Sequence, residues 1–467
     1  MTKISSPLFS RRQALASLSV GAMTAALPKS ALANLGCGAS FHADDPYIKG
    51  VVARENLTSV IQWSDMMLQA VRTYSVAPPP ATRIFATGHM AGFAAVASAT
   101  GRYEVPFNLG EAPEGLNLEI AYGVAVAKAM SAVLGIDTSC NLEEFLSAFE
   151  DTAEKARAIS WGTVAARTVV AARATDGADI ALEPVFAKQS GIMAWTPTGP
   201  FFGAEDAPKF SMFSGPLLPG WGAVKPWVIS SAADYSPDPF PSENSSEFAR
   251  QFVKIRDLGG KNSTLRTKDQ SQIAFFWEDG PRGVTPPGHW QVIAMGLMQN
   301  LDLDLVDQAR FMAMLSLAQA DAGIATWHCK FDLDILRPET AIRRGGFDNR
   351  RLQNVRDPNW ETLIPTPPFP AYVSGHSMFS SSSARILARM IGRDEIAFSG
   401  AAPDLINWPT QLTGVTRSWT SLWQAAEEGG ASREYGGIHW EADNTEGLRI
   451  GARIADTVFE TALSPRV

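Results

Sequence analysis

The stretch PPFPAYVSGHSMFSSSSARILARMI, residues 367–391, combines a proline-rich approach with the start of a helix. Its first part does not continue a helix because proline lacks the backbone N–H, whereas residues 377–391 carry apolar side chains at helical spacing. Ser374, Gly375 and His376 therefore lie at a helix start, where free N–H groups and the helix dipole favour an anion. An ordinary serine N-cap followed by a surface histidine is the alternative interpretation.

Two cations upstream of this stretch form a second cluster. Lys330 and Arg337 are seven residues apart, two helical turns, so the spacing predicts both on one helix face. Pro338 disfavours helix at the residue before it, which leaves the Arg337 guanidinium at the end of an element. Taken alone, this pair is equally typical of a solvated lysine and arginine on a surface helix.

A third cluster lies in residues 432–443. Arg433 supplies another oxyanion donor. His439 and Asp443 are four residues apart, one helical turn, so the carboxylate can hold one imidazole nitrogen and leave the other free to bond a metal or attack phosphorus. An ordinary pair on a surface helix is the alternative. Each cluster is weak by itself, but together they indicate one oxyanion site with three cations and a braced histidine.

Helical periodicity covers most of the remaining chain. We predict an all-α protein of two helical bundles, with the oxyanion site in the C-terminal bundle and a long Pro/Gly-rich connection between them. The predicted divisions are a signal peptide at 1–33, an N-terminal helical half at 34–194, the connection at 195–245 and the C-terminal bundle at 246–467. The predicted helices lie at 56–72, 81–99, 119–134, 142–174, 246–258, 268–277, 290–303, 306–322 and 377–391, with breaks at 78–80 and 286–287.

The N-terminus has the features of an export signal. Arg11 and Arg12 are followed by an apolar run at 14–27, and residues 31–33, Ala-Leu-Ala, resemble a cleavage site. We expect a mature chain that starts near Asn34 and is periplasmic or secreted by twin-arginine export. No later segment has the roughly 18 uninterrupted apolar residues that a membrane-spanning helix needs.

The charge balance limits the classes of partner. The net charge is -8 and 19% of the residues are charged, which argues against nucleic-acid binding because that needs a basic face. An anion site in this chain must therefore be a local cluster of cations.

The three clusters resemble the signature that vanadium-dependent haloperoxidases share with the type 2 phosphatidic acid phosphatases: Lys330-(six residues)-Arg337-Pro338, Ser374-Gly375-His376 and Ser432-Arg433-(five residues)-His439-(three residues)-Asp443. Residues 367–372 and Trp327 resemble the chloroperoxidase branch, and the tract from Arg266 to Trp290 is similar to its bacterial members. The resemblance covers roughly residues 50–460 and implies an all-helical fold with a vanadate cofactor.

The resemblance also implies a role for each matching residue. His439 would bond vanadium, and His376 would act as acid and base in peroxide activation. Lys330, besides binding an oxygen, would polarise the peroxide. The residues that would neutralise the vanadate oxygens are Lys330, Arg337, Ser374, Gly375 and Arg433. The supporting residues would be Asp443 behind His439, Asp279 paired with Arg433, and Trp327 and Phe369 on the halide side.

The implied reaction is oxidation of a halide by hydrogen peroxide to a hypohalous species. One position departs from the family: Val373 stands where proline usually precedes Ser-Gly-His, and we expect this to alter loop rigidity rather than chemistry. A soluble exported acid phosphatase of the same superfamily, acting through a phosphohistidine, is the first alternative. A non-catalytic oxyanion-binding helical protein is the second. The halide, the organic acceptor and a homo-oligomeric state are left open.

Overall fold

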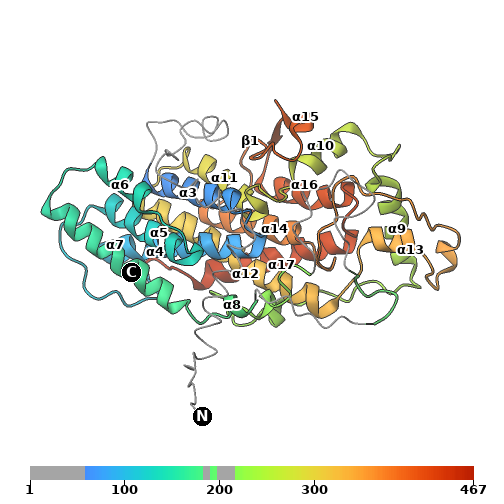
Figure 1. The fold of residues 1–467 in the computed structure, drawn as a ribbon, viewed down its shortest axis with the longest axis horizontal. Coiled ribbons are helices and arrows are strands. Elements are labelled where there is room, and N and C mark those ends of the chain that lie inside the picture. The colour runs from blue at the N-terminus through green and yellow to red at the C-terminus, as the bar shows by residue number, and fades with distance from the viewer. Residues whose placement is uncertain (1–57, 182–189, 197–215, 467) are drawn as a thin grey trace, which may run out of the picture.

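The computed structural model describes residues 58–181, 190–196 and 216–466, and these are mostly helical (Figure 1). Within these ranges the only sheet is the antiparallel pair of β1 (Phe398–Ala401) and β2 (Thr416–Trp419), in which Phe398 lies opposite Trp419. The predicted all-α class is confirmed. The predicted signal peptide at 1–33 and part of the predicted connection lie outside the described residues.

Among the described residues, six helices precede the connection. They are α3 (Ser59–Thr73), α4 (Pro78–Thr100), α5 (Leu118–Leu134), α6 (Ser139–Ser147), α7 (Ala153–Ala172) and α8 (Ala178–Ala181). Three 3-10 turns are η2 (Trp221–Ala223), η3 (Ala232–Tyr235) and η4 (Arg350–Leu352). The later helices are α9 (Ser246–Gly259), α10 (Lys268–Phe276), α11 (Thr285–Met298), α12 (Leu305–Leu333), α13 (Pro338–Arg344), α14 (Gly375–Ile391), α15 (Pro409–Leu412), α16 (Leu422–Tyr435) and α17 (Glu441–Thr461).

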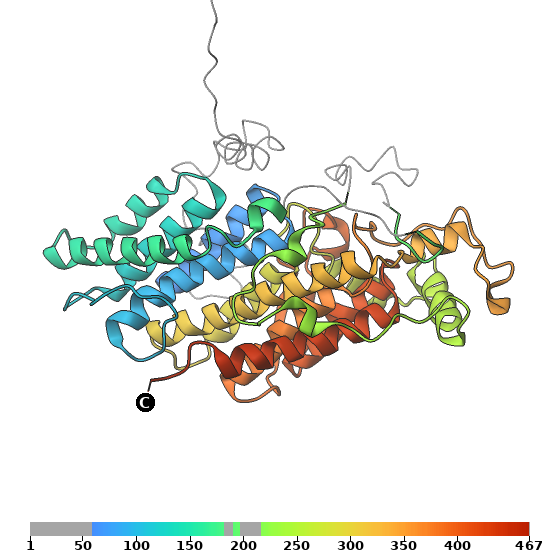
Figure 2. The ribbon, with the colours of Figure 1, turned by 90° about the horizontal axis from the view of Figure 1, so that it is seen from below.

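The two helical bundles pack against each other along α4 and α12. In the N-terminal bundle, α5 packs on both α4 and α7. Helix α4 packs in turn on the long helix α12, which runs through the molecule (Figure 2). One cluster of buried apolar side chains extends from Val60 in α3 to Leu463 after α17. The two bundles therefore share a core, and neither buries its apolar faces alone.

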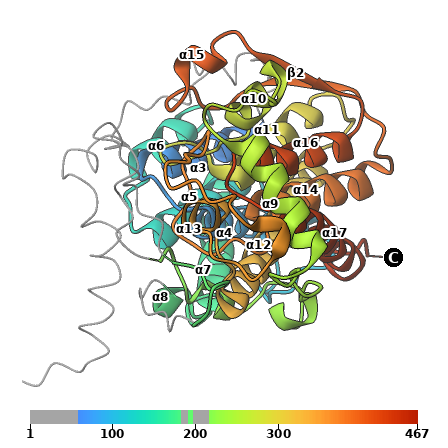
Figure 3. The ribbon, with the colours of Figure 1, turned by 90° about the vertical axis from the view of Figure 1, so that its right-hand side faces the viewer.

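Helix α14 lies at the centre of the C-terminal bundle, in contact with α11, α12, α16 and α17. Its approach to α17 is close because α17 carries glycines there. A Cβ atom added to Gly451 would lie 2.2 Å from Ser381 Oγ, and one added to Gly447 would lie 2.9 Å from the carbonyl oxygen of Ser374. The starts of α14 and α17 consequently lie side by side, and Ser374 N–H donates to the Asp443 carbonyl at 3.0 Å. Helices α9 and α13 lie at one end of the molecule (Figure 3).

Several predicted helix boundaries were wrong, chiefly at prolines. Pro78 begins α4 instead of breaking the chain before it, and Pro286 and Pro287 lie in the first turn of α11. Proline is tolerated there because the first N–H groups of a helix have no partner within it. The single helix predicted at 142–174 is divided into α6 and α7. Among the described helices, none is both long and apolar enough to cross a membrane.

Candidate oxyanion site

Lys330 and Arg337 meet at the end of α12, but not on a shared helix face as predicted. Helix α12 ends at Leu333, where Asp334 takes a left-handed conformation with φ of 50°, and Arg337 is the N-cap of α13. The turn between the helices, rather than helical spacing, brings the two cations together. Lys330 Nζ and Arg337 Cζ each lie 4.9 Å from the centre of the Phe369 ring, so both buried cations contact the same aromatic side chain.

Backbone carbonyls hold these cations in place. Lys330 Nζ donates to the carbonyl oxygens of Pro370 and Ala371 at 2.9 and 3.0 Å. Arg337 Nε donates to the Phe369 carbonyl at 2.8 Å. The proline-rich approach to α14 therefore wraps around both cations, and its irregular backbone supplies the acceptors that a helix would have used internally.

The start of α14 lies where the sequence predicts it. Ser374 is the N-cap, and its side chain accepts from Ser377 N–H at 3.3 Å. A Cβ atom built on Gly375 would meet no heavy atom closer than 3.8 Å, the distance to Thr326 Cγ2. The space beside Gly375 is therefore open toward the cavity described below, so that an oxyanion can reach the first N–H groups of the helix.

His439 is braced from both sides. Its Nδ1 lies 2.7 Å from Asp443 Oδ2, and its Nε2 lies 2.9 Å from Arg337 Nη1. His439 precedes α17 rather than lying on it, and Asp443, in the first turn, also accepts from Trp440 N–H at 2.9 Å. A carboxylate on Nδ1 holds the proton there, so that Nε2 is the nitrogen available to a metal or a phosphorus atom.

Arg433 reaches the site from the last turn of α16. Its guanidinium donates to the carbonyl oxygens of Trp277 and, at 3.2 Å, Ala274. The predicted pair with Asp279 is not formed, because the Asp279 carboxylate instead accepts from His289 Nδ1 at 3.0 Å. Asp279 is near enough to oppose the effect of burial, which lowers the pKa of Arg433 to about 10.

The site holds an excess of buried positive charge. Burial lowers the pKa of Lys330, and the neighbouring Arg337 lowers it further. Burial likewise lowers the pKa of Arg337 to about 9 and raises that of Asp443 to about 7. For His439, burial and then Arg337 hold the pKa well below its usual value. A bound anion would stabilise the charged form of all three cations. Its negative charge would replace the favourable interaction with water that each cation loses on burial.

The buried side-chain atoms of the site that have no hydrogen-bond partner among the described residues include Arg337 Nη2, His376 Nε2 and Asp443 Oδ1. Unpaired buried donors are rare in proteins because each costs the full desolvation of its polar group. Together with the open start of α14, the unpaired Arg337 Nη2 donor fits a ligand with several oxygen acceptors. The donor set fits a tetrahedral oxyanion.

A cavity of about 580 Å³ opens onto these groups. Its polar lining includes Gly375, His376, Arg433 and His439. Trp327 and Phe369 line its apolar side, with ring centroids 5.2 Å apart. The space is large enough for small substrates beside a bound anion.

Sequence reasoning missed the neighbourhood of Asp279. Trp277 and Glu278 provide carbonyl acceptors to Arg433, and His289 provides the partner of Asp279. Asp279 and His289 are ten residues apart across the α10–α11 connection, a spacing with no regular periodicity. The resemblance implies a role for Asp279 beside Arg433, but no local pattern indicates its pairing with His289.

Comparisons with known proteins agree with this geometry. Residues 310–466 match the family model described as the VCPO second helical-bundle domain. The vanadium chloroperoxidase of Curvularia inaequalis is 28% identical over 256 residues, which span 43% of this chain and 41% of that protein. The match thus covers less than half the length of that relative.

Solved structures extend the likeness to most of the chain. A bacterial vanadium-dependent iodoperoxidase has a TM-score of 0.71 and 25% identity over 87% of this chain and 96% of its own. The chain is a relative of the vanadium-dependent haloperoxidases. The holo form of a bacterial vanadium-dependent chloroperoxidase has the same fold, with a TM-score of 0.64 and 17% identity over 89% of this chain and 96% of its own. The family match lies on α12 to α17, the helices that carry all three cations.

Proposed function

We propose that this haloperoxidase relative binds vanadate and oxidises a halide with hydrogen peroxide. The observation that carries the proposal is a cluster of three buried cations around one histidine. Arg433 and His439 line the cavity, Arg337 Nη1 lies 2.9 Å from His439 Nε2, and Lys330 lies beside Arg337. Three buried cations this close together repel one another and are costly to keep out of water. A bound anion would offset both effects. Two relatives support the proposal: a vanadium chloroperoxidase that is similar in sequence, and a vanadium-dependent iodoperoxidase that is similar in fold.

Each residue has a defined task in this proposal. His439 Nε2 would hold vanadium, because Asp443 keeps the proton on Nδ1. Lys330, Arg337 and Arg433 would bind the oxygens as cations, and Ser374 and Gly375 would do so through the hydroxyl and the helix N–H groups. Bound vanadate would supply a Lewis acid that activates peroxide toward halide without a change of oxidation state.

His376 would move the protons. It lines the cavity, and its Nε2 has no hydrogen-bond partner among the described residues. Burial, followed by the charge of Arg433, lowers the pKa of its imidazole. A neutral imidazole beside the oxyanion can accept a proton from peroxide and return it later. Trp327 and Phe369 would exclude water from the halide side of the site.

The decisive experiment loads purified protein with orthovanadate and supplies peroxide with chloride, bromide or iodide and a phenolic dye. We expect halogenation of the dye with at least one halide, and none without vanadate. Absence of activity in protein that carries one vanadium per chain contradicts the proposal.

Phosphoester hydrolysis is the second candidate, because the same geometry suits a nucleophilic histidine. His439 Nε2, held by Asp443 from behind and next to Arg337, could attack phosphorus while His376 protonates the leaving group. The vanadate-free protein should therefore be assayed on p-nitrophenyl phosphate. Rapid turnover of this ester, combined with no halide oxidation, favours the phosphatase.

We further propose that the chain is exported by the twin-arginine route and acts in the periplasm or outside the cell. The support is the sequence alone, namely the paired arginines at 11–12 and the Ala-Leu-Ala at 31–33. N-terminal sequencing of protein recovered from the exported fraction should give a start near Asn34. An intact Met1 in that fraction contradicts this proposal.

A further inference from the structure

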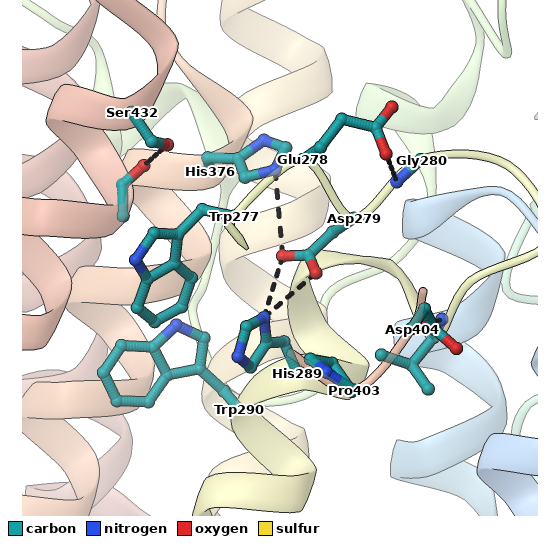
Figure 4. A network of polar contacts seen from close by, with 12 residues as sticks. Trp277, Glu278, Asp279, Gly280, His289, Trp290, His376, Pro403, Asp404 and Ser432 are labelled. Atoms are coloured by element: carbon teal, nitrogen blue, oxygen red, sulfur yellow. Dashed lines mark hydrogen bonds and ion pairs between the residues drawn. The ribbon is translucent and has the colours of Figure 1, made fainter. Parts of the chain in front are cut away.

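A row of ionisable side chains leads from His376 through Asp279 to His289 (Figure 4). His376 Nε2 lies 4.0 Å from Asp279 Oδ2, and Asp279 Oδ1 lies 3.0 Å from His289 Nδ1. The side chains of Asp279 and His289 are 3% and 1% exposed. The buried Asp279–His289 pair and the partly buried His376, whose side chain is 16% exposed, form a short path along which a proton can pass.

The two ends of this path face different cavities. Asp279 and His376 line the cavity of the oxyanion site. His289 lines a second cavity of about 590 Å³, between α11 and the segment that follows α14. That cavity reaches solvent, because its lining includes the exposed residues Asn300, Arg393 and Glu395. The Asp279–His289 pair therefore forms the wall between the oxyanion site and a separate opening to water.

The surroundings hold both side chains in this arrangement. The His289 ring stacks on Trp277, with centroids 4.4 Å apart and planes at 23°. Asp279 has a left-handed backbone with φ of 46°, an uncommon conformation that tends to persist where function requires it. The Trp277 carbonyl accepts from Arg433 Nη2, so one residue supports both the cation and the relay.

We propose that Asp279 and His289 relay protons between His376 and solvent in the second cavity. The inference rests on the proposed function, because H2O2 + X⁻ + H⁺ → HOX + H2O consumes one proton in each turnover. A path separate from the substrate cavity would supply that proton while peroxide and halide occupy the cavity in front.

The transfer requires only N–H and O–H bonds. A proton from water binds His289 Nε2, and the proton on Nδ1 passes to the Asp279 carboxylate. Asp279 Oδ2 then gives this proton to His376 Nε2, after the 4.0 Å contact shortens as catalytic contacts do when a site is loaded. His376 releases one proton from Nδ1 to the reacting oxygen. One proton enters, one leaves, and reorientation of the imidazole rings restores the starting tautomers.

The test compares two substitutions of His289 in the full chain loaded with vanadate. His289→Asn keeps a donor where Nδ1 stands, so it preserves the hydrogen bond to Asp279 but cannot pass a proton. We expect kcat to fall about 10- to 100-fold, at or below the range typical of general acid–base catalysis, with vanadium content and the KM for halide unchanged. His289→Ala opens the wall to the second cavity, and added imidazole should restore its kcat in proportion to imidazole concentration.

The control is His89→Asn, which alters another fully buried histidine, hydrogen-bonded to Tyr122 and outside the residues that line the two cavities. It should leave kcat within twofold of the wild type, and imidazole should have no effect. Wild-type kcat in His289→Asn, or an alanine variant that imidazole does not rescue, overturns the relay.

A readout without turnover separates the relay from the proposed function. In protein with ¹⁵N-labelled histidine and bound vanadate, NMR reports how quickly the His376 Nε2 proton exchanges with water. We expect His289→Asn to slow this exchange and His89→Asn not to change it. Equal exchange rates in wild type and His289→Asn overturn the relay. Absence of halide oxidation in the wild type, by contrast, contradicts the proposed function and leaves this measurement to decide the relay.

Discussion

His439 is the residue on which anion retention depends most. His439 lines the cavity, its Nε2 lies 2.9 Å from Arg337 Nη1, and its Nδ1 is fixed by Asp443 at 2.7 Å. We expect His439→Ala to lose vanadium on gel filtration while keeping its helical circular dichroism. Asp443→Asn should weaken vanadate affinity about 10- to 100-fold, since groups that orient a ligating histidine typically contribute this much. Vanadium content equal to the wild type in His439→Ala contradicts its role as the ligand.

Glu339 makes folding stability depend on pH. Burial raises its pKa from 4.5 to about 7, opposed by the hydrogen bond from Thr366 and by Arg343. The folded state thus binds a proton that the unfolded state releases between pH 4.5 and 7, so this group's contribution to stability is present below 4.5 and lost as pH rises through 7. We expect Glu339→Gln to raise the free energy of unfolding at pH 8 relative to the wild type, by on the order of 2 kcal/mol.

Urea unfolding at pH 5 and pH 8 measures this effect. Glu460→Gln is the matched control, because the Glu460 side chain is 63% exposed and pairs with Arg389 at the surface. Its stability should follow the wild type at both values of pH. A Glu339→Gln curve that runs parallel to the wild type between pH 5 and 8 contradicts the assignment.

At the scale of elements, two glycines in neighbouring helices have opposite roles. A Cβ atom at Gly375 meets only ordinary contacts of 3.8 Å or more and would project toward the cavity. We expect Gly375→Ala to change the free energy of unfolding by less than about 1 kcal/mol but to weaken vanadate binding, because the methyl group would occupy the place of an oxygen.

For Gly451 we expect the opposite result, namely a loss of stability with little direct effect on vanadate binding. A Cβ there would lie 2.5 Å from the carbonyl oxygen of Met378, in the backbone of α14. Gly451→Ala should therefore force α17 away from α14 and cost about 2 kcal/mol, as overpacking generally does. Chemical denaturation and vanadate titration of both variants provide the measurement. Unchanged vanadate affinity in Gly375→Ala would show that the oxyanion does not approach this helix start.

At the scale of the whole molecule, Asp321 in α12 binds the backbone of the connection at residues 227–229. Its buried carboxylate accepts from the N–H groups of Trp227, Val228 and Ile229 at 2.6, 2.8 and 2.9 Å. We expect Asp321→Ala to lower the free energy of unfolding by about 3 kcal/mol or more, because three buried donors lose their acceptor.

Asp321→Asn, which keeps one acceptor oxygen, should cost less than the alanine variant. Limited proteolysis should cut Asp321→Ala between residues 216 and 240 before it cuts the wild type. Asp234→Ala is the control, since Asp234 accepts a hydrogen bond from Ser230 at the surface. Equal stability of Asp321→Ala and Asp234→Ala contradicts the role of Asp321.

The sequence alone determined the helical class and predicted which side chains form the candidate oxyanion site. Helices are local structures, in which each hydrogen bond joins residues four apart, so periodicity and the N-cap at Ser374 could be interpreted from neighbouring residues. The prolines at 78 and 286 were misplaced because the same residue that breaks a helix interior also suits its first turn.

Only the tertiary structure decided which distant side chains meet. Lys330 and Arg337 converge because the chain turns between α12 and α13, and not because of helical spacing. Asp279 pairs with His289 rather than Arg433 because backbone carbonyls of α10 already occupy that guanidinium. Buried donors must each find an acceptor, and the core offers few acceptors, so several donors compete for each one. The competing groups come from segments far apart in the chain, and no periodic pattern in the sequence shows which of them will pair.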